Sequence, residues 1–123
     1  MTTQPIVVWA EIPVSDIRKA TAFYNAAFDW SMEVDTTSGP EPMALLGGRM
    51  DTVGGNLYEG DVAEDGRGPR VHIAIDIKLE DAAKRWENAG GKVITEPVEI
   101  PPGRFVFATD PDGNTLGLFE PKG

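Results

Sequence analysis

The sequence predicts an α+β domain built from two tandem βαβββ modules, whose mixed sheets form a cleft with the helices on their outer faces. Two observations lead to this prediction. Along the chain the hydrophobic pattern changes from strand to helix to three strands, and the whole series then occurs a second time. The two series also align with one another at a constant offset. The same spacing separates Trp9 from His72, Phe23 from Trp86, and Gly54 from Gly117.

The first module covers about residues 5–58 and begins with a strand over Ile6–Ile12. Alternate side chains of a strand point to opposite faces. One face is purely apolar and is expected in the core: Ile6, Val8, Ala10 and Ile12. The other face carries Val7, Trp9 and Glu11. A merely structural strand has no need of a tryptophan and a carboxylate side by side, so this second face is the first candidate for function.

A helix follows this strand, capped by Asp16 or Ser15, with an apolar stripe that runs to Phe28. Three strands complete the module, at Trp30–Asp35, Met43–Leu46 and Thr52–Tyr58, with a loop at Thr36–Pro42. The next segment, about residues 59–69, is polar, acidic and rich in glycine, which is typical of a flexible link.

The second module covers about residues 70–121 and has the same order of elements. A strand at Arg70–Ile77 precedes a helix at Leu79–Ala89, which Gly90 and Gly91 end. Lys92–Ile100 is a strand, and a Pro-Pro-Gly turn follows it. Arg104–Thr109 and Thr115–Glu120 form a hairpin, because the Asp-Pro-Asp-Gly-Asn segment between them is a strong turn signal.

Strand parity predicts which side chains line the cleft. Val71, Ile73, Ile75 and Ile77 form an apolar face that must lie under a helix, so His72 and Asp76 point into the cleft. Leu116, Leu118, Val53 and Leu57 are assigned to the helix side in the same way. For Phe105 and Phe107 the parity is less clear. The predicted ligand-binding residues are Trp9, Glu11, Asn56, Tyr58, His72, Asp76, Phe107 and Phe119. Aromatic rings and carboxylates suit planar or cationic organic ligands.

Composition excludes several classes of function. The 123 residues carry a net charge of −9, which argues against binding a phosphate backbone. The absence of cysteine excludes disulfides and thiolate chemistry and fits a cytoplasmic location. No apolar run approaches the roughly 20 residues of a membrane span, and the first residues do not resemble a signal peptide. We therefore expect a small-molecule ligand and neither nucleic acid nor a membrane as partner.

Three segments carry a resemblance to a known family: EIPVSDIRKATAFYNAAFDW, AGGKV and FVFATDPDGNTLGLFEP. Together they resemble the glyoxalase, bleomycin-resistance and extradiol-dioxygenase superfamily, also called vicinal oxygen chelate proteins, over nearly the whole chain. The form of the first segment is similar to small bacterial single-domain members. The resemblance implies two βαβββ modules around a cleft, which agrees with the repeat, but it names no substrate.

Enzymes of this family bind a divalent metal through His and Glu side chains on the first and last strand of each module. Carried over by position, those places are Trp9, Gly54, His72 and Gly117. Only His72 is a type of residue that binds metals, and a site needs three or four donors. The resemblance therefore implies no metal cofactor here, although a displaced site made by His72, Glu11 and Asp76 stays open.

Three functions remain open. The first is a protein that binds an aromatic or cationic compound in the cleft without the family metal. The second is an enzyme, a lyase or isomerase of the glyoxalase type or a dioxygenase-like protein, in which His72 with Glu11 or Asp76 is the acid–base pair. The third is an interaction module whose cleft serves self-association or binds a regulatory partner. Sheet edges invite pairing, and we expect a homodimer.

Overall fold

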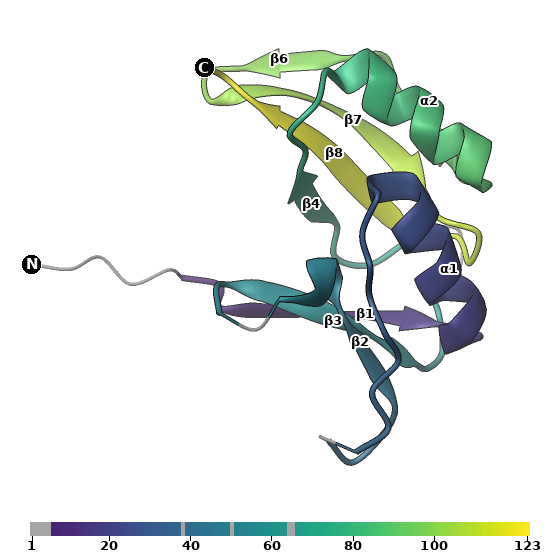
Figure 1. Cartoon of the computed structure of the whole chain (residues 1–123). Helices are drawn as coiled ribbons and strands as arrows, with labels where there is room; N and C mark the ends of the chain where they lie inside the picture. The colour runs from purple at the N-terminus through teal and green to yellow at the C-terminus, as the bar shows by residue number, and fades with distance from the viewer. Residues whose placement is uncertain (1–5, 38, 50, 64–65) are drawn as a thin grey trace, which may run out of the picture.

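The computed structural model describes residues 6–37, 39–49, 51–63 and 66–123. Residue 5, the expected start of the first module, and residues 64–65 of the expected link lie outside this part of the chain. The fold is α+β, as predicted, with one helix and one mixed sheet from each half of the chain (Figure 1). The helices lie side by side, and the two sheets do not close into a single barrel. Among the described residues, no helix has the length and apolarity needed to cross a lipid bilayer.

The first half forms a sheet of three strands. Its elements are β1 (Trp9–Val14), α1 (Ile17–Phe28), β2 (Met43–Leu45), a short 3-10 turn (Leu46–Gly48) and β3 (Gly54–Glu59). The strand order is β1-β3-β2, with β1 parallel and β2 antiparallel to β3. The side chain of Asp16 accepts hydrogen bonds from the amides of Arg18 and Lys19, so Asp16 is the residue that caps α1.

The strand expected at Trp30–Asp35 is not formed. Only Asp35 pairs with a strand, through an isolated bridge to Met43. The side chain of Asn25 in α1 explains the difference. Its amide group donates to the carbonyl of Met32 at 3.1 Å, and its carbonyl oxygen accepts from the Met32 amide at 2.7 Å. The helix thus takes both backbone groups that a strand would have offered at this residue.

The apolar residues before β1 are not in the core, contrary to the prediction. Ile6 is fully exposed and Val8 is 61% exposed. Val53, which parity assigned to the helix side, is 50% exposed. One reason covers all three. β1 and β3 begin together, with Trp9 opposite Gly54, so the residues before them have no neighbouring strand that could bury them.

The second half forms a larger sheet. Its elements are β4 (Val71–Ala74), α2 (Leu79–Ala89), β5 (Lys92–Val93), β6 (Val98–Ile100), β7 (Gly103–Thr109) and β8 (Thr115–Pro121). The order is β4-β8-β7-β5, and β6 pairs with another stretch of β7. The predicted strand Lys92–Ile100 is thus two strands. Between them the hydroxyl of Thr95 accepts from the Phe107 amide at 2.9 Å, and Pro97 has no amide to donate.

The internal repeat is visible in the strand pairing. Trp9 of β1 lies opposite Gly54 of β3, and His72 of β4 lies opposite Gly117 of β8, both in parallel pairs. The helix starts are also equivalent. A carboxylate from the last strand of each half accepts from the first helix amide, Glu59 from Ile17 at 3.1 Å and Glu120 from Leu79 at 2.9 Å.

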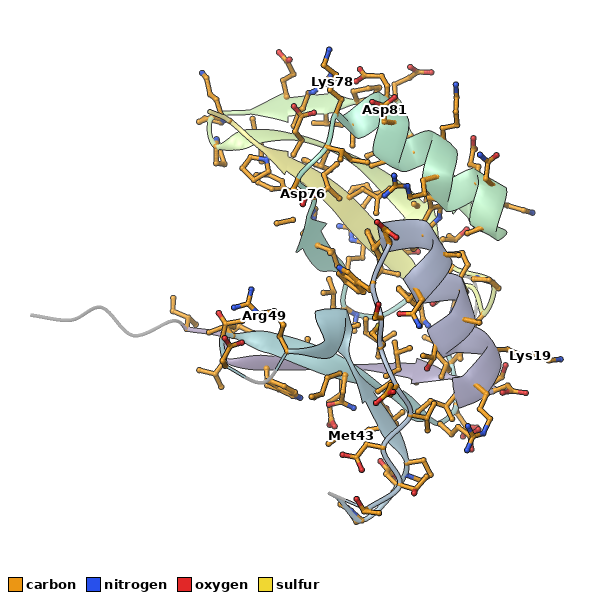
Figure 2. The ribbon with its side chains drawn as sticks, in the orientation of Figure 1. Lys19, Met43, Arg49, Asp76, Lys78 and Asp81 are labelled. Atoms are coloured by element: carbon orange, nitrogen blue, oxygen red, sulfur yellow. The ribbon has the colours of Figure 1, made fainter. Side chains whose placement is uncertain are left out.

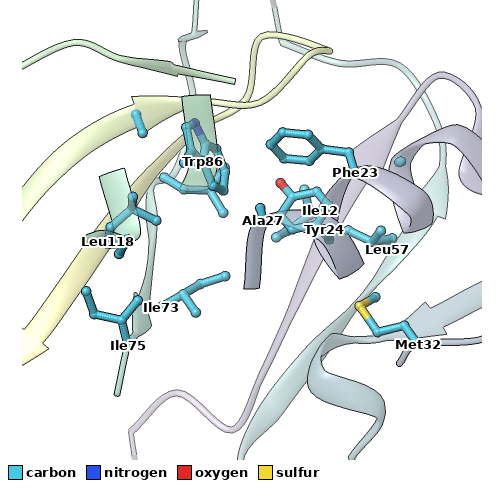
Figure 3. Packing of buried hydrophobic residues seen from close by; sticks show 14 of the residues in the cluster. Ile12, Phe23, Tyr24, Ala27, Met32, Leu57, Ile73, Ile75, Trp86 and Leu118 are labelled. Atoms are coloured by element: carbon cyan, nitrogen blue, oxygen red, sulfur yellow. The ribbon is translucent and has the colours of Figure 1, made fainter. Parts of the chain in front are cut away.

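One core joins the two halves, and it is centred on the helices (Figure 3). Phe23 of α1 and Trp86 of α2, which the repeat makes equivalent, meet edge to face with ring centroids 4.8 Å apart. Leu57 on one sheet and Leu118 on the other are fully buried beneath them. As predicted by parity, Leu116 and Leu118 point to the helix side of the second sheet.

Besides the shared core, the Asp-Pro-Asp-Gly-Asn turn between β7 and β8 also connects the two halves. The buried carboxylate of Asp110 accepts the hydroxyl proton of Tyr24 in α1 at 2.8 Å. The side-chain amide of Asn114 donates to the carbonyl of Pro13 at 2.8 Å, and Asp112 accepts from Ser15. The turn therefore has a structural role beyond reversing the chain, because it ties the last hairpin to β1 and α1.

Candidate functional site

The face of the second sheet that points away from α2 carries an aromatic cluster. Val106 and Ala108 of β7 are buried against the helix, so Phe105 and Phe107, which alternate with them, point to the opposite face. This settles the parity of that strand. His72, Gly117 and Phe107 are opposite one another across β4, β8 and β7, with the glycine in the middle. Because Gly117 has no side chain, the two rings on either side of it can meet.

The rings of this cluster contact each other edge to face. The imidazole of His72 lies 5.1 Å from the Phe105 ring and 5.5 Å from the Phe107 ring, and the two phenyl rings are 5.1 Å apart. The guanidinium carbon of Arg70 lies 4.3 Å above the centroid of Phe107. Burial and then the charge of Arg70 lower the pKa of His72 below its ordinary value of 6.5. Both effects favour the neutral form of the imidazole.

The equivalent face of the first sheet is more polar. The indole N–H of Trp9 donates to the side-chain oxygen of Asn56 at 2.7 Å, and Asn56 is only 2% exposed. Tyr58 is half-buried farther along β3, and Glu11 is exposed on β1. Trp9 and Asn56 thus form a fixed pair, and the space above Gly54 is left open, with the nearest neighbour 4.0 Å from where a β-carbon would lie.

The structure does not join these two faces by direct contacts. Within the described part of the chain, no hydrogen bond, ion pair or ring contact connects the side chains of one face to those of the other. In particular, His72 has no hydrogen bond to Glu11 or Asp76, the carboxylates considered as its acid–base partners.

Asp76 lies apart from His72, past the end of β4 where the chain leads into α2 (Figure 2). There it lines a groove of about 420 Å³ together with Trp30 and Arg85 on the helix side of the molecule. Phe119 is half-buried on β8, opposite Phe105. The prediction left Phe105 open and did not weigh Arg70. Phe105 could have been found from the alternation Phe-Val-Phe-Ala, but nothing in the sequence places Arg70 over a ring.

The positions that correspond to the family metal ligands do not fit a metal. Trp9 and Gly54, and likewise His72 and Gly117, are paired across their sheets, so the four positions occupy equivalent places as the repeat requires. Two glycines and an indole supply no donor. His72 itself leans over Gly117, where a second ligand would have to stand. Within the described residues, no three His, Asp or Glu side chains come together as a metal site, the displaced set of His72, Glu11 and Asp76 included.

Comparisons with known proteins define the family. The sequence model of the Glyoxalase/Bleomycin resistance protein/Dioxygenase superfamily matches residues 6–118, and the chain belongs to this superfamily. It is 32% identical over 119 residues to "Putative glyoxylase CFP32" of Mycobacterium tuberculosis, covering 94% of this chain and 44% of the relative. The chain thus spans less than half the length of that protein.

Solved structures confirm the fold. The hypothetical protein SA1046 of Staphylococcus aureus superposes with a TM-score of 0.71 at 15% identity, covering 96% of this chain and 95% of the other. The antibiotic-binding protein TnmS3 of Streptomyces sp. CB03234 superposes with a TM-score of 0.67 at 23% identity, covering 99% and 100%. At these identities the likeness concerns the fold alone.

Proposed function

We propose that this protein binds a planar aromatic small molecule against the cleft-side face of the second sheet, without the metal of its enzymatic relatives. One observation supports the proposal: His72, Phe105 and Phe107 form a ring cluster over Gly117, on the sheet face opposite to α2. Aromatic side chains gathered on such a face have a hydrophobic surface that a flat ligand can cover.

The donor set supports a binding function more than metal-dependent catalysis. Only one of the four family metal positions holds a donor, and among the described residues no carboxylate forms a hydrogen bond with His72 as an acid–base partner. The fold is known to serve antibiotic binding in TnmS3, which makes a stoichiometric binder a reasonable member of this superfamily.

A second copy of the chain would complete the site. In one chain His72 is exposed and the two phenyl rings are half-buried, and β1 and β4 are edge strands of their sheets. Unpaired strand edges favour association. We therefore include a homodimer in the proposal, in which the partner covers the ligand from the side that the single chain leaves open.

Isothermal titration calorimetry against a panel of planar aromatic compounds, with EDTA present throughout, tests this function. We expect saturable one-to-one binding by at least one compound and no turnover. His72→Ala and Phe107→Ala should each weaken it at least severalfold, whereas Lys84→Ala, on the exposed surface of α2, should not. Absence of binding by every compound, or binding that needs added metal, would contradict the proposal.

A further inference from the structure

We infer that the ring cluster selects aromatic anions, with Arg70 as the residue that anchors the negative group. This inference rests on the proposed function and adds the charge class of the ligand to it. A planar carboxylate, sulfonate or phenolate would place its ring on Phe105 and Phe107 and its oxygen atoms at the guanidinium of Arg70.

The geometry of Arg70 is the first support. Its guanidinium carbon sits 4.3 Å above the Phe107 ring, and within the described residues no hydrogen bond or ion pair to a carboxylate is formed. Two other arginines of the chain are held by carboxylates. Arg104 is bound by Glu80 and Glu120, and Arg49 by Asp51, at distances of 2.7–3.0 Å. Arg70 therefore keeps its fork of N–H donors available next to the rings.

The surroundings of the cluster are the second support. The chain has 20 acidic and 11 basic side chains, so most basic side chains could have a carboxylate nearby. An arginine that instead lies at a ring cluster without a carboxylate partner is therefore unexpected. The charge that perturbs His72 is that of Arg70, after the larger effect of burial, and no carboxylate contributes. More distant acidic groups are screened over a Debye length of about 8 Å in physiological salt. Arg70 is therefore the charged group that lies in contact with the rings.

A planar ligand can contact the phenyl rings and the Arg70 guanidinium at the same time. The Arg70 guanidinium already stacks on an aromatic ring, and guanidinium planes match carboxylates with two parallel hydrogen bonds. A flat anion that lies along the Phe105–Phe107 surface can meet the edge of that plane without moving it far. A cation would instead have to approach Arg70 directly, at a cost in repulsion.

Three probes with the same ring system test the inference by calorimetry in EDTA at pH 7.5: 2-naphthoate, neutral 2-naphthamide and cationic 2-naphthylmethylammonium. We expect the wild type to bind naphthoate roughly tenfold tighter than the amide, the ratio that a single charge-assisted contact supplies. Arg70→Gln should remove this preference and leave amide binding unchanged. Arg70→Lys should keep part of it. The matched control Arg85→Gln, an exposed arginine of α2, should keep all of it.

The outcomes separate the inference from the proposed function. If naphthoate and naphthamide bind equally well, or the ammonium probe binds best, the anion inference is overturned while aromatic binding stands. If the preference survives in Arg70→Gln, another residue makes it and the assignment of Arg70 is wrong. If none of the three probes binds, the anion inference fails, whereas the proposed function fails only if every compound of the wider panel also does not bind.

Discussion

The imidazole of His72 lies over the α-carbon of Gly117, so closely that a β-carbon added there would come 2.2 Å from Nδ1. The two residues are direct partners across β4 and β8. Trp9 and Gly54 are partners in the same way in the first sheet, but there the space above the glycine is open. The repeat is thus symmetric in its backbone and asymmetric in its side chains, and the ring cluster forms on one side only.

Gly117→Ala should displace His72 and open its contact with Phe107. We expect a loss of about 1–3 kcal/mol in the free energy of unfolding, as for other overpacked sites, together with weaker ligand binding. Urea denaturation and calorimetry measure the two effects. Gly54→Ala is the matched control, because its new methyl group would have its nearest neighbour 4.0 Å away. Equal effects of the two substitutions would show that the His72–Gly117 contact has no special role.

The pKa of His72 should lie below 6.5, because burial and Arg70 both disfavour the imidazolium. His72 is the single histidine of the chain, so its imidazole proton signals in an NMR titration are unambiguous. Arg70→Gln should raise this pKa toward the ordinary value. A pKa above 6.5 in the wild type would contradict the arrangement of the cluster.

The same shift makes stability depend on pH. The folded state binds the His72 proton less readily than the unfolded state, so protonation favours unfolding. The contribution is present above pH 6.5 and is lost as pH falls from there through the lower pKa of the folded state. Thermal unfolding of the wild type should therefore decline more than that of His72→Gln between about pH 7 and pH 5. Identical profiles for the two proteins would count against the shift.

Tyr24→Phe should weaken the contact between α1 and the last hairpin and so lower the free energy of unfolding. It removes the 2.8 Å hydrogen bond to the buried Asp110 carboxylate, which costs about 2 kcal/mol for a charged acceptor. Burial and Asp110 also raise the pKa of Tyr24, so its contribution should be lost only as pH rises above about 10. Tyr58→Phe is the control, since the Tyr58 hydroxyl makes no hydrogen bond within the described residues. An unchanged free energy of unfolding in Tyr24→Phe would show that the Tyr24–Asp110 hydrogen bond does not stabilise the contact between α1 and the last hairpin.

Trp9→Phe should destabilise the first sheet by about 1–2 kcal/mol, because the side-chain oxygen of buried Asn56 would lose its indole donor. Trp30→Phe removes a similar volume from a half-buried indole whose N–H has no acceptor in the described part of the chain, and should cost less. Chemical denaturation of both variants measures the two losses in the free energy of unfolding. A larger loss for Trp30→Phe would mean that packing, not the hydrogen bond, holds Trp9.

Much of the fold could be predicted because it follows from local pattern. The helix Leu79–Ala89 has the predicted bounds, and the spacing of Trp9, Gly54, His72 and Gly117 predicted the equivalence seen in the strand pairing. Errors arose where one distant contact outweighs the local pattern. Asn25 takes the backbone groups of Met32 and prevents a strand that the alternation at Trp30–Asp35 favours.

The site was less predictable for a related reason. Parity tells which face a side chain occupies, but for the strand of Phe107 it was ambiguous until the burial of Val106 and Ala108 showed which face points to the helix. It does not tell how far along the chain a strand continues, so Asp76 was grouped with His72 although β4 ends at Ala74. Contacts such as Arg70 over Phe107 depend on side-chain conformation, which alternation of polar and apolar residues does not encode.

The most direct test of the proposed function follows the imidazole signal of His72 by NMR while planar aromatic compounds are added in the presence of EDTA. The account predicts that at least one compound shifts this signal saturably in the wild type, and that Phe107→Ala abolishes or strongly weakens the effect. A His72 signal that responds to none of the compounds, or that moves only when a divalent metal replaces the EDTA, would contradict it.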